Sequence, residues 1–193
     1  MTRRTLDIIF ATVGLIIAGL ILILGLVLQN QADFAKHYVH NQLSQQRITF
    51  TPANLLKANE TGQCLKDNAG KPLVTGKQAE CYANHYIAVH LSESNDGKTY
   101  AETSSQLRAL PDQTSAEAKD LSAKVQTLFQ GETLRGLLLT SYGFSIFGDR
   151  AQTAAYVCYL VAGLLFLAAI AGYIHAATKS AERQILSPTS PTN

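Results

Sequence analysis

The stretch Leu6–Leu28, LDIIFATVGLIIAGLILILGLVL, and the stretch Ala151–Ile174, AQTAAYVCYLVAGLLFLAAIAGYI, decide the fold of this 193-residue chain. No Asp, Glu, Lys, Arg or His occurs between Ile8 and Leu28, or anywhere in the second stretch. At about 1.5 Å per residue, a helix of about 23 residues crosses a hydrocarbon core that is about 30 Å thick. A core helix of a soluble domain would carry polar residues about once per turn, and neither stretch does. The sequence therefore predicts two transmembrane helices.

The direction of the two helices follows from the basic residues beside them. Arg3 and Arg4 precede the first stretch, and Lys179 and Arg183 follow the second. Because Lys and Arg accumulate on the cytoplasmic side, both termini are predicted to be cytoplasmic and the protein to lie in the plasma membrane. The predicted order is a cytoplasmic N-terminus (1–5), a first transmembrane helix (6–28), an extracytoplasmic domain (29–150), a second transmembrane helix (151–174) and a cytoplasmic, partly disordered tail (175–193) that ends in the Ser- and Pro-rich segment Ser187–Asn193.

A cleaved signal peptide is the alternative for the first stretch, because its positively charged start fits one. Its apolar run, however, exceeds the usual length of about 7–15 residues. Ala32, with Asn30 two positions before it, makes a poor cleavage site. An uncleaved anchor is the better interpretation.

The central region is electrically balanced. It carries twelve basic and twelve acidic residues, and the net charge of +2 comes from the two ends of the chain. A balanced domain argues against electrostatic binding of nucleic acid or of an acidic membrane surface. We therefore predict no nucleic-acid partner.

Two of the three cysteines, Cys64 and Cys81, lie in the central region, and Cys158 lies in the second apolar stretch. In an oxidising compartment two thiols at this separation can pair. The disulfide would close a turn-rich loop and stabilise the domain by about 3 kcal/mol. Two unpaired thiols are the alternative. A CxxC redox motif is absent.

The central region is predicted to be mainly helical, so the fold class is mainly α, with two antiparallel transmembrane helices flanking an extracytoplasmic helical domain. Apolar residues at helical spacing, N-capping residues and turn residues set the limits of each element. The expected elements are a helix from the first stretch to about Gln46, an extended piece at 47–51, an irregular segment at 52–74, a helix at 77–92 with Thr75 as its N-cap, a turn at 95–97, a helix at 99–110, and a helix from Ser115 that continues into the second apolar stretch.

Small residues recur at helical spacing in both apolar stretches and give each a smooth face, on which helix backbones can approach closely in lipid. We interpret these faces as the packing surface of the two helices against each other, with docking onto another membrane subunit as the alternative. The predicted packing residues are Ala11, Gly14, Ala18 and Gly25 in the first stretch and Ala155, Cys158, Ala162, Ala169 and Gly172 in the second.

Four histidines are the candidates for a metal site. His37 and His40 stand three positions apart on one predicted helix, and His85 and His90 lie on another. Such pairs suit zinc, copper or non-haem iron. His-x-x-His pairs are common by chance, and His90 falls on an apolar stripe. We therefore predict structural or surface histidines, with no metal and no cofactor.

Several blocks of the chain resemble a family of small actinobacterial membrane proteins with two transmembrane helices. The blocks are Gln42–Phe50, Gly76–Leu91, Gly97–Glu102 and Gln126–Phe144, the last with Gly131–Gly136 at its centre. Some members carry the label of an aromatic ring-opening dioxygenase subunit, yet that activity needs an iron-binding set of histidines and a carboxylate, which this sequence does not offer. The resemblance implies a bacterial cell-envelope setting and no particular activity.

No nucleophile elbow, phosphate-binding glycine loop or His-Glu-x-x-His motif occurs in the chain. The predicted function is therefore that of a non-enzymatic protein of the lipid bilayer, a scaffold or accessory subunit that binds another membrane or periplasmic protein. The alternative is an enzyme, metal-dependent or not, that uses the four histidines.

Overall fold

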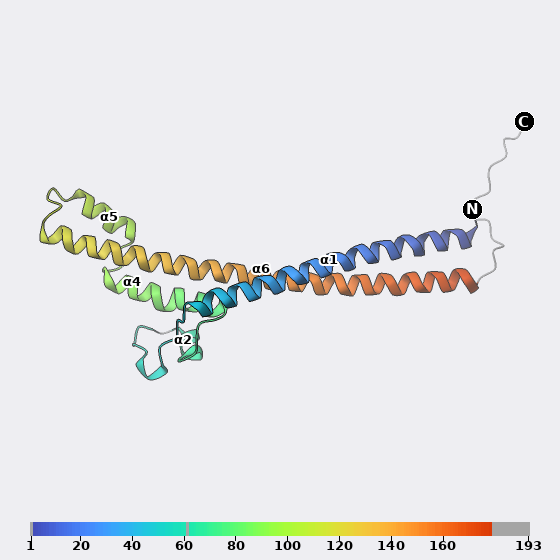
Figure 1. Cartoon of the computed structure of the whole chain (residues 1–193), viewed down its shortest axis with the longest axis horizontal. Helices are drawn as coiled ribbons and strands as arrows, with labels where there is room; N and C mark the ends of the chain where they lie inside the picture. The colour runs from blue at the N-terminus through green and yellow to red at the C-terminus, as the bar shows by residue number, and fades with distance from the viewer. Residues whose placement is uncertain (1, 61, 179–193) are drawn as a thin grey trace, which may run out of the picture. The chain divides into compact units, whose positions relative to one another are not determined.

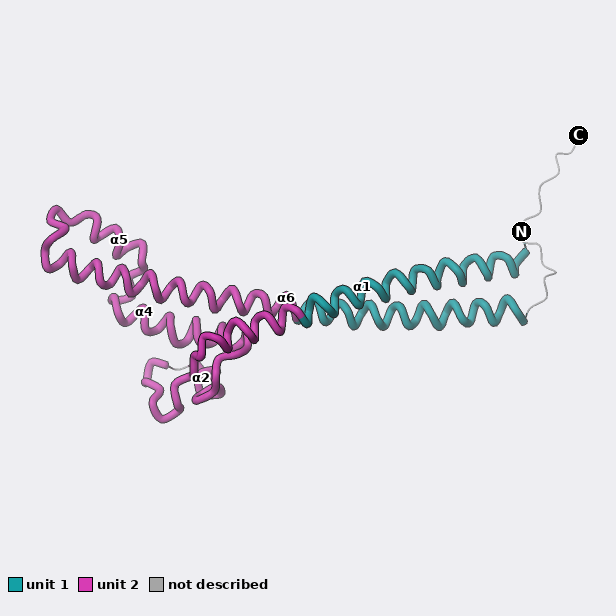
Figure 2. Tube along the Cα trace, in the orientation of Figure 1, with its two compact units in different colours: residues 1–33, 149–193 teal, residues 34–148 magenta. Residues whose placement is uncertain are grey.

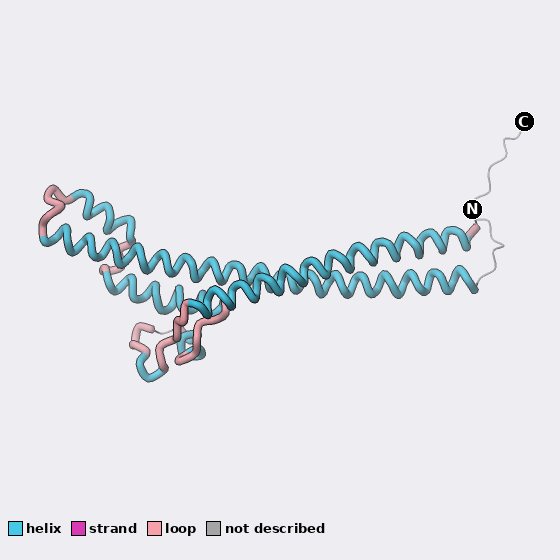
Figure 3. Tube along the Cα trace, viewed as in Figure 1, coloured by secondary structure: helices cyan, strands magenta, loops and turns pink. Residues whose placement is uncertain are grey.

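A computed structural model describes residues 2–60 and 62–178, so the predicted disorder of Ser187–Asn193 lies outside the described residues. These residues are mainly helical and contain no β-strand, which agrees with the mainly helical structure that the sequence predicts (Figures 1 and 3). The elements in chain order are α1 (Arg3–Gln45), the 3-10 helix η1 (Ala53–Leu55), α2 (Gln63–Asn68), α3 (Gly76–Cys81), the π-helix η2 (Tyr82–Ile87), α4 (Ala88–Ser94), α5 (Tyr100–Ala109) and α6 (Ala116–Thr178).

The chain divides into two compact units, shown in different colours in Figure 2. Unit 1 comprises residues 1–33 and 149–193, and unit 2 comprises residues 34–148. Helices α1 and α6 contribute to both units, because the predicted continuation of each apolar stretch as one helix is observed. The helix expected to reach about Gln46 ends at Gln45, and the helix expected from Ser115 begins at Ala116.

Unit 1 contains the two segments that are long and apolar enough to cross a membrane. In the apolar stretch of 18 residues within each helix, only 17% of the residues of α1 and 11% of those of α6 are buried. The large side chains of both stretches therefore point away from the protein. A helix in the core of a soluble domain would bury such side chains, whereas a helix that faces lipid leaves them exposed.

The buried residues of unit 1 are small and recur every seven positions. On α1 they are Ala11, Ala18, Gly25 and Ala32, and on α6 they are Ala155, Ala162, Ala169 and Ala176. A seven-residue repeat keeps one face of a helix turned toward a partner helix. Small side chains on that face bring the two backbones close together.

Three contacts of unit 1 join α1 to α6. A Cβ atom added at Gly25 would lie 2.8 Å from the Tyr159 ring and 3.1 Å from the Cys158 Cβ atom. A Cβ atom at Gly172 would lie 3.2 Å from that of Ala11. The hydroxyl groups of Thr12 and Tyr173 lie 2.8 Å apart, within hydrogen-bonding distance.

We expect the Gly25→Ala substitution to destabilise this helix pair by about 1–3 kcal/mol, because its Cβ atom has no room beside Tyr159 and Cys158. Gly19→Ala is the matched control, since a Cβ atom there meets nothing within 4 Å. Thermal unfolding of the full chain in mild detergent measures both variants. Equal melting temperatures for the two would contradict the close packing at Gly25.

The hydrophobic core of unit 2 is built from segments that are distant in the sequence. Its buried members are Val39, Leu43, Phe50, Leu65, Leu73, Ala79, Cys81, Ala83, Ile87, Leu91, Leu128 and Leu138. Phe50 is only 1% exposed and meets the edge of the Tyr82 ring at a centroid distance of 5.4 Å. The core thus joins α1 and α6 to the short elements between them.

The prediction that residues 52–74 are irregular is wrong at Gln63–Asn68, where the helix α2 forms. Six residues are too few for a helix to be stable alone in water. Tertiary contacts stabilise α2: Leu65 is buried in the core, and Cys64 is covalently linked to Cys81.

The extended piece at 47–51 pairs with residues 70–73. Phe50 accepts a backbone hydrogen bond from Gly70 and donates one to Lys71, and Leu73 donates one to Ile48. Arg47 enters this piece with a positive φ of 51°. The pairing amounts to a single antiparallel bridge and presents Phe50 to the core.

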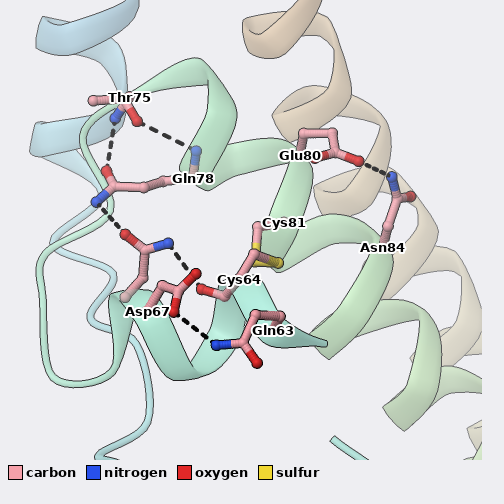
Figure 4. The surroundings of a disulfide bond; sticks show 9 residues. Gln63, Cys64, Asp67, Thr75, Gln78, Glu80, Cys81 and Asn84 are labelled. Atoms are coloured by element: carbon pink, nitrogen blue, oxygen red, sulfur yellow. Dashed lines mark hydrogen bonds between the residues drawn. A yellow bond between two sulfur atoms is a disulfide. The ribbon is translucent and has the colours of Figure 1, made fainter. Parts of the chain in front are cut away.

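A hydrogen-bonded network surrounds the Cys64–Cys81 disulfide, as Figure 4 shows. Thr75 caps α3 by accepting from the Gln78 N–H group, and the Gln78 side chain accepts from the Thr75 N–H group in return. The Gln78 amide also donates to Asn68 at the end of α2. The cap predicted at Thr75 therefore also links α3 to α2.

The helix predicted at 77–92 is observed as α3, η2 and α4 in succession, with a π-helical middle. Both ends of this helix pack on α6: an added Cβ atom at Gly76 would overlap Ser145, and one at Gly131 would overlap Leu91. Gly76 and Leu91 are fifteen positions apart. In a regular α-helix this separation corresponds to a rotation of about 1500°, so the two residues would differ in direction by about 60° after four full turns. A π-helix turns less per residue, so η2 brings both ends onto one face.

Candidate docking groove and the predicted site residues

An apolar groove lies between α1 and α6 within unit 2. Its volume is about 260 Å³. The side chains from α1 are those of Tyr38, Val39, Gln42, Leu43 and Gln46, and those from α6 are Leu134, Leu137, Leu138, Thr140, Ser141 and Phe144.

Large apolar side chains are exposed in and beside this groove. Leu137 is 62% exposed, and the Tyr38 and Phe144 rings are each 45% exposed with their centroids 5.9 Å apart. Phe34 stacks on Tyr38 at 5.8 Å, and Phe147 is 76% exposed. A contiguous set of exposed apolar side chains marks a surface that something covers.

The polar residues that line the groove carry no charge. Gln42 and Gln46 contribute amides from α1, and Thr140 and Ser141 contribute hydroxyl groups from α6. The volume is below the range of about 300–1,000 Å³ that is usual for small-molecule sites. The groove therefore suits the protruding side chains of another helix better than an enclosed ligand.

No three of the four candidate histidines come together as a group that could hold a metal ion in the part of the chain that the structure describes. His37 and His40 are exposed on α1, His85 is exposed on η2 beside Gly62, and His90 is half-buried on α4. Within residues 2–60 and 62–178 there is no group of three or more His, Cys, Asp or Glu side chains placed to hold a metal ion. The geometry offers no basis for assigning these histidines to a shared site.

His90 has a partner that the sequence did not reveal. Its Nε2 atom lies 2.8 Å from Glu60 Oε1, and Glu60 Oε2 accepts a hydrogen bond from the Lys57 backbone N–H group at 3.0 Å. Glu60 is only 3% exposed. A search for acidic residues at helical offsets from His90 could not find Glu60, which stands thirty positions earlier in a different segment.

His90 also ends a row of aromatic rings in unit 2. Its ring lies 4.4 Å from that of Tyr86, Tyr86 stacks on Tyr82 at 4.6 Å, and Tyr82 meets Phe50. The three residues on η2 and α4 are spaced by four positions, which places them on one helix face. Tyr82, Tyr86 and His90 form what we call the aromatic row.

The aromatic row and the turn beside it contain two groups with a shifted pKa. Burial raises the pKa of Glu60, but the hydrogen bonds from the Lys57 N–H group and from His90, with the charges of these two residues, outweigh burial and lower the pKa below its ordinary value. Burial first, and then the neighbouring Tyr86 and Glu60, raise the pKa of Tyr82 to about 12. Glu60 is therefore an anion, and Tyr82 a neutral phenol, near neutral pH.

The structure joins Cys64 and Cys81 in a disulfide, whereas Cys158 remains a free, half-buried thiol on α6. Of the nine predicted packing residues, six are buried: Ala11, Ala18, Gly25, Ala155, Ala162 and Ala169. Gly14, Cys158 and Gly172 are half-buried. The sequence did not single out Ala32, which belongs to the same seven-residue series on α1.

Comparisons of the chain with protein-family models, with curated protein sequences and with solved structures find no match. The resemblance to the actinobacterial two-helix membrane proteins therefore stays a prediction.

Proposed function

We propose that this chain is a non-enzymatic protein of the bacterial plasma membrane that docks another membrane or periplasmic protein through the groove of unit 2. In this proposal α1 and α6 cross the bilayer as an antiparallel pair, both termini are cytoplasmic, and unit 2 is extracytoplasmic. The observation that carries the docking role is the exposed apolar groove between α1 and α6.

The order of the contacts in unit 1 supports the antiparallel arrangement. Ala11, near the start of α1, meets Gly172 near the end of α6, while Gly25 meets Tyr159, thirteen residues earlier on α6. Contacts that lie later in the sequence of one helix and earlier in that of the other are those of an antiparallel pair.

The disulfide and the basic residues support the orientation. Cys64 and Cys81 are bonded, and disulfides persist in oxidising compartments such as the bacterial periplasm and the cell surface. Arg3 and Arg4 at one end of the chain, and Lys179 and Arg183 at the other, fit cytoplasmic termini.

The lining of the groove indicates the chemistry of the partner. Its apolar side chains favour an apolar helix face, and its polar residues Gln42, Gln46, Thr140 and Ser141 offer hydrogen bonds that an acyl chain cannot use. No carboxylate, ammonium or guanidinium group lines the groove. An amphipathic helix with uncharged polar residues along its flanks fits this surface best.

The test is the Leu137→Asp substitution, which places a charge in the groove. We expect wild-type protein purified from native membranes in mild detergent to retain a stoichiometric protein partner, and the variant to lose it. A buried, unpaired carboxylate would weaken the complex by several kcal/mol.

Phe129→Asp is the matched control, because Phe129 is 53% exposed on the same helix and does not line the groove. This variant should retain the partner. A wild-type protein that elutes as a single protomer without a partner, or a partner that remains bound to the Leu137→Asp variant, would contradict the proposal.

A further inference from the structure

The turn Leu56–Glu60 is held against α4 by its last residue. Leu56 packs on the core of unit 2, while Lys57, Ala58 and Asn59 are exposed. Glu60 donates its backbone N–H group to the Lys57 carbonyl at 3.0 Å, and its side chain accepts from the Lys57 N–H group. The carboxylate thus closes the turn on itself and attaches it to His90.

A second side-chain contact joins the same two segments. The Asn59 amide donates to the carboxylate of Glu93, three residues beyond His90 on α4. The contact with Glu60 is the more buried of the two, since Glu60 is 3% exposed and His90 is half-buried, whereas Asn59 and Glu93 are both exposed. The bond between Glu60 and His90 is therefore the one that water competes with least.

The surroundings of Glu60 make the strength of this attachment depend on its negative charge. A buried carboxylate is tolerated when hydrogen bonds or opposite charges compensate it. Within its own turn, Glu60 is compensated by the N–H group and the charge of Lys57, and on α4 it is compensated by His90. Tyr82 on η2 also lies near enough to interact electrostatically with the carboxylate. Hydrogen bonds to a charged group are about twice as strong as those between neutral groups, so neutralising Glu60 weakens both of its bonds.

We propose that Leu56–Glu60 is a latch that opens when the Glu60 carboxylate is neutralised. Opening frees the turn from His90 and exposes the aromatic row formed by Tyr82, Tyr86 and His90. In the closed state these rings are half-buried.

The direction of the pH dependence follows from the pKa of Glu60, which is lower in the folded protein than its ordinary value of 4.5. A carboxyl group of this kind stabilises the closed state above its ordinary pKa. That contribution is lost as the pH falls through the lowered pKa. The latch is therefore closed at neutral pH and opens in acid.

Tryptic cleavage after Lys57 measures the opening directly, because this residue lies within the latch. With full-length protein in detergent micelles at neutral pH, Glu60→Gln and His90→Ala should each be cleaved after Lys57 about ten-fold faster than wild type, or more. Glu102→Gln, which alters an exposed carboxylate that caps α5, is the control and should be cleaved at the wild-type rate.

Hydrogen exchange separates local opening from unfolding of unit 2. In wild type the amides of the latch should lose protection as the pH falls below 4.5, whereas those of residues 116–147 on α6 keep theirs. In Glu60→Gln the latch should be unprotected at every pH. Cleavage of Glu60→Gln at the wild-type rate, or loss of protection throughout unit 2 together with the latch, would overturn the proposal.

Discussion

The Phe50→Ala substitution should lower the free energy of unfolding of unit 2 by about 3–5 kcal/mol, because it removes a whole aromatic ring from a packed core. Phe50 is 1% exposed, and its ring meets that of Tyr82 edge to face. The bridge between residues 47–51 and 70–73 holds the Phe50 backbone in place. The surrounding side chains can therefore fill the cavity only in part.

Denaturant unfolding of the full chain in mild detergent measures this loss, followed by tyrosine fluorescence because the chain has eight tyrosines and no tryptophan. Phe129→Ala is the control, since it removes the same ring from a site that is 53% exposed. The control should cost much less. Equal losses for the two variants would show that Phe50 is not a core residue.

Removing the disulfide should have the second-largest effect. A Cys64→Ala, Cys81→Ala double variant should lose about 3 kcal/mol of stability, because the unfolded chain regains the entropy of a loop that spans seventeen positions. Replacing both cysteines avoids leaving an unpaired thiol at Cys81, which is 1% exposed. We expect α2 to unfold first, since its six residues depend on Leu65 and the disulfide for stability.

A reducing agent distinguishes this effect from a packing defect. Dithiothreitol should lower the unfolding midpoint of wild type toward that of the double variant and leave the double variant unchanged. Cys158→Ala, which alters the free thiol, should respond to the reductant as wild type does. A wild-type midpoint that does not change on reduction would contradict a stabilising disulfide.

Both effects concern the same part of unit 2, in which short elements are attached to α1 and α6. Phe50, the disulfide and the Glu60–His90 pair each join segments that have few local contacts of their own. The docking groove, in contrast, lies between the two long helices. Variants in the core and variants in the groove should therefore have different effects. Core variants should reduce stability, and groove variants should reduce partner binding.

The long elements of this fold could be predicted because local patterns specify them. Uninterrupted apolar runs and regular helical spacing indicated α1 and α6, and Thr75 marked the start of α3. The turn residues Asn95, Asp96 and Gly97 marked the end of α4, where Asp96 and Gly97 take positive φ. In each case the signal lies within a few residues of the structure that it specifies.

Helix α2 and the π-helical form of η2 could not be predicted, because both depend on residues that are distant in the sequence. Helix α2 lacks a side-chain N-cap and depends on Leu65 and Cys64, whose partners lie elsewhere in the chain. The π-helix η2 lies between two contacts with α6 that packing requires on one helix face, Gly76 with Ser145 and Leu91 with Gly131. Neither requirement is visible in the local sequence.

The same distinction applies to the site residues. The sequence by itself determined that two long apolar helices exist, where small side chains recur on them, and which cysteines can pair, because spacing and composition carry this information. Only the tertiary structure decided that no three of the four histidines form a group within residues 2–60 and 62–178, that Glu60 reaches His90, and that exposed apolar side chains meet in a groove between α1 and α6. A cluster of side chains depends on which segments the core brings together, and that choice is made by the packing of the whole unit.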